Sequence, residues 1–205
     1  MDNSHQRLTV LDQITSSDRV RRKIIDAASA LYAQKGYTAT SIEEISERAG
    51  VSLPVTYHYV KKKSEIMKMI MEDMLKAFRE SLLGELRAAH DPKEKLSIAV
   101  RLYFRITDQN REKVLLMYQK SGSLDREAKS RIMQLEVDLS EIFSAIIKEG
   151  IQEHTFKKVD FDLMSYNIIM MAHMWVLKRW HFKNRLSLQQ YIDLQISSIL
   201  DALLS

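Results

Sequence analysis

The sequence predicts an all-α protein, with a small N-terminal domain of three helices and a larger C-terminal helical domain, about nine helices in total. Two observations support this fold class. The chain has 205 residues but only 2 Pro and 5 Gly, so few positions interrupt a helix. Apolar residues also recur at helical spacing in most segments. We expect a flexible arm over 1–16, the small domain over 17–63 and the larger domain over 64–205.

The first helix is expected from about Asp18 to Lys35, with one apolar face. A second, short helix follows. Thr40 and Ser41 are both favourable N-cap residues, and each has a glutamate three residues later, as in a capping box. Gly50 is expected to end this helix in the left-handed conformation, which costs glycine little.

A third helix, also short, begins after the turn at Gly50. Ser52 is a suitable N-cap, and Pro54 falls in the first turn, where a missing N–H is harmless. The helix then exposes three consecutive rings and is followed directly by three lysines: Tyr57, His58, Tyr59, Lys61, Lys62 and Lys63. All of these side chains donate hydrogen bonds to phosphate, which predicts a helix-turn-helix that binds DNA. Packing of the rings against a neighbouring helix is the alternative.

Positive charge is concentrated in the small domain. Residues 17–63 carry nine Lys or Arg and five Asp or Glu, and this excess equals the net charge of +4 of the whole chain. One basic cluster lies around the start of the first helix, and the other directly follows the third helix. This distribution is the electrostatic footprint expected of a surface that binds nucleic acid.

Four segments carry a family resemblance: Arg22–Leu31, Lys35–Ile42, Ile45–Ser52 and Tyr57–Lys63. Together they make residues 19–75 resemble the DNA-binding domain of the TetR family of bacterial transcription repressors. The match is dense, in order, and covers about the first third of the chain. It implies a third helix that reads double-stranded operator DNA, and a second domain too variable to be matched by motif.

The resemblance also implies contacts residue by residue. Thr40 and Ser41, at the start of the second helix, are expected to reach a phosphate, and Lys63 holds the position of a phosphate-clamping lysine. The start of the third helix would face base edges, and its end would touch phosphate, sugar or base: Ser52, Leu53, Pro54, Val55, Tyr57, His58 and Tyr59.

The third helix departs from the family pattern in three places. Val55 replaces a common threonine or serine, Thr56 replaces an inward-facing leucine or isoleucine, and Leu53 is apolar where a hydrogen-bonding residue is frequent. The base-reading positions are therefore poor in hydrogen-bonding groups. We expect Leu53, Pro54 and Val55 to prefer thymine methyl groups in the major groove.

The larger domain is expected to begin with a long helix capped by Ser64, which connects the two domains. Four further helices are expected over 92–108, 110–120, 125–149 and 161–181, and a last one over 188–204. Gly150 and the polar segment after it are expected to end the helix that starts at Asp125.

The last two helices, about 161–182 and 188–204, are apolar on more than one face, so they must be buried on more than one face. In a chain of this size that pattern indicates a subunit interface. The resemblance implies the same, because the final two helices of the family usually pair in a four-helix bundle. A homodimer with two-fold symmetry would match a two-fold operator.

A pocket for a small apolar effector is expected in the larger domain. The 11 Met residues are many for this length, and methionine repacks easily around flexible ligands, although ordinary core filling explains them equally well. The segment around Trp175 resembles the C-terminal helix of family members that respond to fatty-acyl or other acyl-CoA thioesters. The expected ligand contacts, with the guanidinium at the pocket mouth, are Tyr103, Phe104, Met117, Phe143, Met171, Trp175 and Arg179.

Other classes of protein have little support. The chain has no cysteine, no visible secretory signal, and no apolar run long enough to span a membrane, so we expect a cytoplasmic location. No cofactor or metal site is expected, since His173 and His181 are eight residues apart and the other histidines are scattered. Three hypotheses remain: a ligand-responsive dimeric repressor, a DNA-binding regulator controlled by a protein partner or by no ligand, and, least supported, a helical-bundle enzyme.

Overall fold

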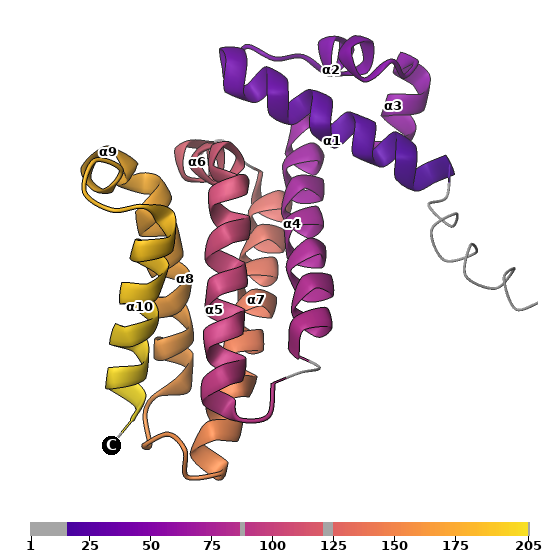
Figure 1. Cartoon of the computed structure of the whole chain (residues 1–205). Coiled ribbons are helices and arrows are strands. Elements are labelled where there is room, and N and C mark those ends of the chain that lie inside the picture. The colour runs from indigo at the N-terminus through magenta and orange to yellow at the C-terminus, as the bar shows by residue number, and fades with distance from the viewer. Residues whose placement is uncertain (1–15, 87–88, 121–124, 205) are drawn as a thin grey trace, which may run out of the picture. The chain divides into compact units, whose positions relative to one another are not determined.

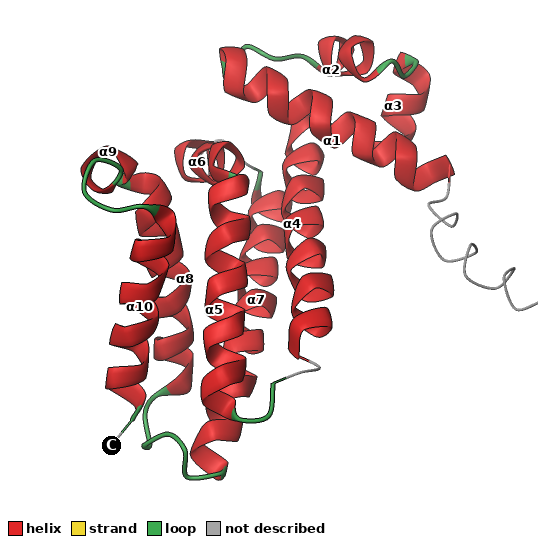
Figure 2. Cartoon of the chain, in the orientation of Figure 1, coloured by secondary structure: helices red, strands yellow, loops and turns green. Residues whose placement is uncertain are grey.

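The computed structural model describes residues 16–86, 89–120 and 125–204. These residues form ten helices and no strand, which confirms the all-α prediction (Figure 1, Figure 2). Contacts divide the chain into two compact units, one ending at Met69 and the other beginning at Ile70. Residues 1–15 of the expected arm lie outside the described residues, and Ser16 is already the first residue of a helix.

The N-terminal unit contains α1 (Ser16–Lys35), α2 (Ile42–Ala49), α3 (Leu53–Tyr59) and the start of α4. Its core is built by one face of each helix, and the main fully buried side chains are Ile24, Ile25, Ala28, Ile45, Val60, Ile66 and Met67. Helix α2 packs on α1, and α3 packs on α2. This is the helix-turn-helix arrangement that the sequence predicts.

Local sequence explains why α2 is short. Of the two possible capping boxes, the structure forms the one with Ser41: its Oγ accepts from the Glu44 N–H, and the Glu44 carboxylate accepts from the Ser41 N–H. At the other end Gly50 has φ 62°, and its N–H closes the helix on the Glu47 carbonyl. The predicted left-handed glycine is therefore present.

The C-terminal unit is a bundle of long helices. The helix α4 (Lys63–Glu85) begins in the first unit and continues into this one. It is followed by α5 (Pro92–Gln109), α6 (Arg111–Lys120), α7 (Arg126–Gln152), α8 (Phe161–Leu177), α9 (Arg179–Phe182) and α10 (Leu188–Leu203). Helix α5 is central: it packs on α7, α8 and α10, which run beside it in Figure 1. Among the described residues no helix is both long and apolar enough to cross a membrane.

Two aromatic clusters fill this bundle. Phe78 of α4 contacts Tyr103 of α5 and Phe143 of α7, with ring centroids 5.4 and 5.9 Å away. Further along, Trp175 of α8 and Tyr191 of α10 have ring centroids 5.0 Å apart. The first cluster attaches α4 to the rest of the bundle.

The helix expected to end at Gly150 and the polar segment after it ends in that segment, and Gly150 itself is still helical. Helix α7 runs on to Gln152, and the left-handed residue is His154, with φ 58°. Gly150 is required by packing instead: a Cβ at this position would lie 2.1 Å from a ring carbon of Phe156. The missing side chain at Gly150 leaves room for the Phe156 ring, and the helix continues past this glycine.

The helix expected over 161–181 is divided into two. Helix α8 ends at Leu177, Lys178 departs from helical backbone with φ −113° and ψ 26°, and α9 then forms one short turn. The division adds the tenth helix to the nine expected.

Candidate DNA-binding surface and effector pocket

Helix α3 and its N-cap expose most of the residues that were predicted to meet DNA there, and Leu53 and Tyr59 are half-buried. Val55 and Tyr57 are each 41 % exposed, and Ser52, Pro54 and His58 are exposed as well. Thr56 faces inward and is fully buried, as expected for that position. The exposed start of α3 carries a proline and a valine, so the surface that would face DNA is apolar and has no side-chain hydrogen-bonding group at these two positions.

The two tyrosines at the end of α3 have fixed hydroxyl groups. The Tyr57 hydroxyl donates to Glu43 Oε1 of α2 at 3.2 Å, and the Tyr59 hydroxyl donates to Ser17 Oγ of α1 at 3.0 Å. The backbone and Ser41 hydrogen bonds at the α2 N-terminus, together with the one from Tyr57, lower the pKa of Glu43, and the hydrogen bond to Glu43 raises the pKa of Tyr57. Each contact orients a ring at the surface and uses the single hydroxyl proton, so the hydroxyl must leave this acceptor to donate to a phosphate.

Lys63 and Thr40 are engaged inside the unit. The ammonium group of Lys63 donates to the carbonyls of Tyr37 and Thr40 at 2.8 and 2.7 Å, and burial lowers its pKa. The Thr40 side chain is 2 % exposed, and its hydroxyl donates to the Gly36 carbonyl at 2.9 Å. In this arrangement both residues hold the loop between α1 and α2, and neither polar group points into solvent toward a phosphate.

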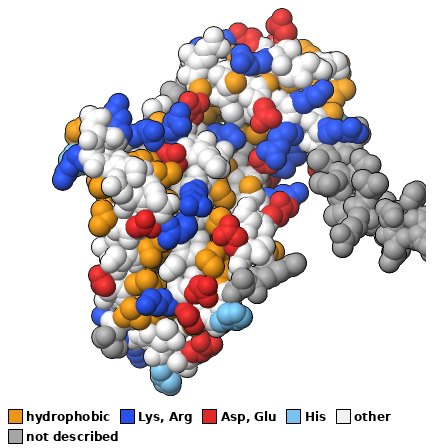
Figure 3. Space-filling view, viewed as in Figure 1, with side chains coloured by type: hydrophobic (Ala, Val, Ile, Leu, Met, Phe, Trp, Pro, Cys, Tyr) orange, Lys and Arg blue, Asp and Glu red, His pale blue; other side chains and the backbone are white. Residues whose placement is uncertain are grey.

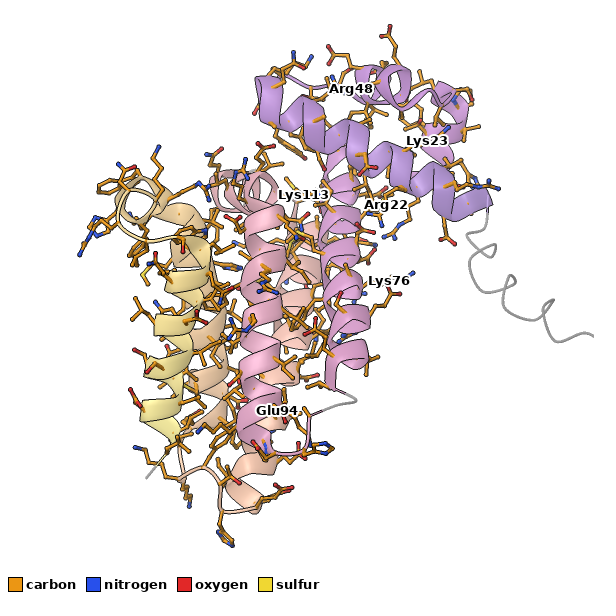
Figure 4. The ribbon with its side chains drawn as sticks, in the orientation of Figure 1. Arg22, Lys23, Arg48, Lys76, Glu94 and Lys113 are labelled. Atoms are coloured by element: carbon orange, nitrogen blue, oxygen red, sulfur yellow. The ribbon has the colours of Figure 1, made fainter. Side chains whose placement is uncertain are left out.

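Exposed basic side chains accompany α3. Figure 4 labels Arg22 and Lys23 on α1 and Arg48 on α2, and all three are exposed. Lys61 and Lys62, directly after α3, are exposed too. On the face in view in Figure 3, Lys and Arg side chains gather over the beginning of α1. These groups supply the positive potential that DNA phosphates require.

A pocket of about 240 Å³ lies inside the C-terminal unit. Five helices line it, and its walls are mainly apolar. The lining residues are Met71, Met74, Leu75, Phe78, Tyr103, Ile106, Val114, Met117, Tyr118, Lys129, Ile132, Met133, Leu135, Glu136, Leu139 and His173. Four of these residues come from α4, the helix that continues into the N-terminal unit.

Of the seven predicted ligand contacts, the structure places Tyr103 and Met117 in this pocket. Phe143 lies behind the wall, with its ring 5.7 Å from that of Tyr103. The remaining four residues lie elsewhere: Phe104, Met171, Trp175 and Arg179. For Trp175 the reason is the orientation of α8, because His173 faces the pocket whereas the Trp175 ring packs against Tyr191 of α10.

Arg179 has a partner within the protein. It donates to Asp108 Oδ1 at 2.7 Å, and the indole N–H of Trp175 donates to the same oxygen at 2.8 Å. The guanidinium also lies 5.7 Å from the Trp175 ring. This arrangement joins α5 to the end of α8, so Arg179 serves as a structural link here.

A polar group closes one end of the pocket. The ring nitrogens of His173 lie 2.8 Å from the hydroxyls of both Tyr103 and Tyr118. A neutral imidazole donates from one nitrogen and accepts at the other, so it satisfies both tyrosines. Burial lowers the pKa of His173 to about 4, which keeps the ring neutral at physiological pH. The sequence offered only the position of His173 on α8 as a sign that it lines the pocket. Because α8 is apolar on most of its surface, that position did not show which side of the helix faces the pocket.

Helix α8 also has an exposed apolar stripe. Leu163, Tyr166, Met170 and Met174 follow one another at helical spacing, and each is 36–62 % exposed. On another apolar face of α8, Ile169 and Ala172 are buried within the protomer. Exposed apolar stripes of this kind are typical of protein–protein contact surfaces.

The fold and these two sites define a helix-turn-helix regulator with a second, pocket-bearing helical domain. Residues 24–70 match the family described as "Bacterial regulatory proteins, tetR family", and residues 89–202 match "Tetracyclin repressor-like, C-terminal domain". The chain therefore belongs to the TetR family of transcriptional regulators, which are DNA-binding proteins and not enzymes.

Individual relatives agree with this assignment. The chain is 28 % identical to the HTH-type transcriptional regulator HbdR of Aromatoleum sp. (strain CIB), over 84 % of this chain and 76 % of the relative. A TetR-family regulator from Syntrophomonas wolfei has a similar structure, with TM-score 0.77, 24 % identity, and coverage of 89 % and 94 %. The regulator FadR of Bacillus subtilis, solved with stearoyl-CoA, has TM-score 0.72, 23 % identity, and coverage of 90 % and 97 %.

Proposed function

We propose that this regulator is a homodimer that represses transcription from a two-fold operator in the cytoplasm and is released by a small, largely apolar effector. One observation carries the proposal: four residues of α4 line the pocket, and the same helix begins at Lys63, which holds the loop before α2. An effector that displaces α4 would therefore also disturb the helix-turn-helix unit. Such control requires different effector affinities in the two states.

For DNA, we propose that α3 enters the major groove with Leu53, Pro54 and Val55 against base edges, where thymine methyl groups would be preferred. Tyr57, His58 and Tyr59 would contact the backbone, together with Ser41 and Ser52 at the helix N-termini. The exposure of Val55 and Tyr57 supports this assignment. Lys63 and Thr40 would act indirectly, by fixing the loop between α1 and α2.

For the dimer, we propose that the exposed stripe of α8 pairs with the same stripe of a second copy, with α10 beside it. Leu163→Glu should then shift the protein from dimer to monomer in sedimentation. An acidic residue is well tolerated in the first turn of a helix, so the protomer should remain folded. Leu83→Glu on α4, which changes a leucine of similar exposure, is the matched control and should stay dimeric.

For the effector, the apolar lining of the pocket supports an acyl chain or a body of similar polarity. The stearoyl-CoA bound to the B. subtilis FadR makes an acyl-CoA thioester a reasonable first candidate. The alternative, control by a protein partner, does not explain an internal pocket that reaches α4.

Native mass spectrometry of the protein as purified, under gentle and then denaturing conditions, tests these proposals together. The expected result is a dimer that carries a small molecule, released on denaturation, whose mass tests the acyl-CoA candidate. A strict monomer would contradict the two-fold mechanism. A ligand-free dimer to which acyl-CoA thioesters do not bind would contradict this class of effector.

A further inference from the structure

Glu136 is the unusual residue of the pocket. It lies on α7 among apolar neighbours such as Met133 and Leu139, and its side chain is half-buried. Within the described ranges it forms no hydrogen bond or ion pair. A carboxylate in an apolar wall normally needs a donor or a cation beside it, because its desolvation is costly. The missing donor is therefore expected from the ligand.

The groups around Glu136 agree with this expectation. The hydroxyls of Tyr103 and Tyr118 both line the pocket and are held by the neutral ring of His173. Among the described lining residues, this end of the pocket thus contains hydrogen-bonding groups but no positive charge. Burial also raises the pKa of Glu136, which shows that this environment disfavours negative charge.

The positively charged side chain in the pocket lining lies away from this end. Lys129 also lines the pocket from α7, but it is exposed and lies seven residues before Glu136, on the order of 10 Å along the helix. An anionic portion of an effector would be neutralised at Lys129. A second negative charge beside Glu136 would be repelled and poorly solvated.

We infer that Glu136 is a specificity-determining residue, which selects effectors whose buried end carries an uncharged hydrogen-bond donor such as a hydroxyl, and which rejects a free carboxylate at that position. A hydroxyl would donate to the Glu136 carboxylate and lie within reach of the tyrosine hydroxyls. The inference rests on the proposed effector pocket and adds the polarity of its ligand.

Isothermal titration calorimetry with octan-1-ol and octanoate on the full chain at neutral pH tests the inference. The two probes share a chain that suits the pocket and differ in the terminal group. Wild-type protein should bind octan-1-ol at least about tenfold more tightly than octanoate, which corresponds to one charge-assisted hydrogen bond. Glu136→Gln removes the charge at nearly constant size and should bring the two affinities to within about threefold.

Glu141→Gln provides the matched control. Glu141 is an exposed glutamate of the same helix, outside the pocket lining, so its substitution should leave the wild-type preference unchanged. If Glu136→Gln does not fold, Glu136→Met, which also removes the charge at this partly exposed helix position, is titrated in its place and should show the same loss of preference.

The outcomes separate the two proposals. Equal binding of both probes by the wild type, or an unchanged preference in Glu136→Gln, would overturn the specificity role while the pocket would stand. Failure of both probes to bind any of the proteins would refute the pocket as an effector site, and the inference with it.

Discussion

Gly150→Ala should destabilise the protein, although the same change inside a helix usually stabilises it. Alanine is favoured over glycine in a helix interior by about 1 kcal/mol. Here, however, the new methyl group would lie 2.1, 2.5 and 2.8 Å from three ring carbons of Phe156. Real Cβ atoms do not approach other carbons so closely, so the ring must move.

The ring has little freedom to move. Phe156 is 3 % exposed, and the backbone on both sides is held, because the Phe156 N–H donates to the Gly150 carbonyl at 2.9 Å and the Lys157 N–H to the Leu203 carbonyl at 2.8 Å. Overpacking costs about 1–3 kcal/mol, and expulsion of a phenylalanine costs about 3–5 kcal/mol. After the gain in propensity, we expect a net loss of about 2 kcal/mol.

Urea unfolding followed by circular dichroism, at one fixed protein concentration, measures the change. Gly84→Ala is the matched control, since a Cβ at this helical glycine would meet no atom within 4 Å and should not destabilise. In a Phe156→Ala background the sign should reverse, and Gly150→Ala should stabilise by up to about 1 kcal/mol. A Gly150→Ala variant as stable as the wild type, or an effect that Phe156→Ala leaves unchanged, would refute the packing argument.

Two further substitutions test the sites. Lys63→Met should lower the free energy of unfolding, measured in urea titrations, by about 1–2 kcal/mol, because the Tyr37 and Thr40 carbonyls lose a charged donor. It should also weaken operator binding. Unchanged stability would contradict the role of Lys63 in holding the loop before α2. The pKa of His173 lies near 4 in the folded protein and at 6.5 without burial, so the unfolded chain binds the additional proton between these values and stability falls as the pH drops through this window. From pH 7 to pH 5 we expect a loss of about 2 kcal/mol from this residue, which His173→Gln should remove; an equal loss in both proteins would contradict it.

Much of the fold could be predicted from the sequence because its signals are local. The Ser41 capping box and the left-handed Gly50 depend on residues within one turn, and both were recognised correctly. The polar segment after Gly150 ends α7 as predicted, but the role given to Gly150 was wrong. This glycine makes room for the Phe156 ring, a contact that forms only after the chain folds back. A glycine required for packing and a glycine that ends a helix look the same in the sequence.

The pocket was harder to predict for a related reason. Tyr103 was found because α5 has a clear apolar face. Helix α8 is apolar on all sides, so its sequence does not show which side meets the pocket and which meets α10. Met171 and Trp175 were selected, whereas His173, which lies on another face, reaches the pocket. Likewise, the Lys63 position predicts a positive group near DNA, but the carbonyls that bind its ammonium group are more than twenty residues away.

Selection of bound sequences from a random duplex DNA library tests the central claim most directly. The full chain should enrich two inverted half-sites with two-fold symmetry, with thymine at the positions under Val55, and Tyr57→Ala should abolish the enrichment. Enrichment of a single, asymmetric site, or of no sequence at all, would contradict a dimeric regulator that reads operator DNA through α3.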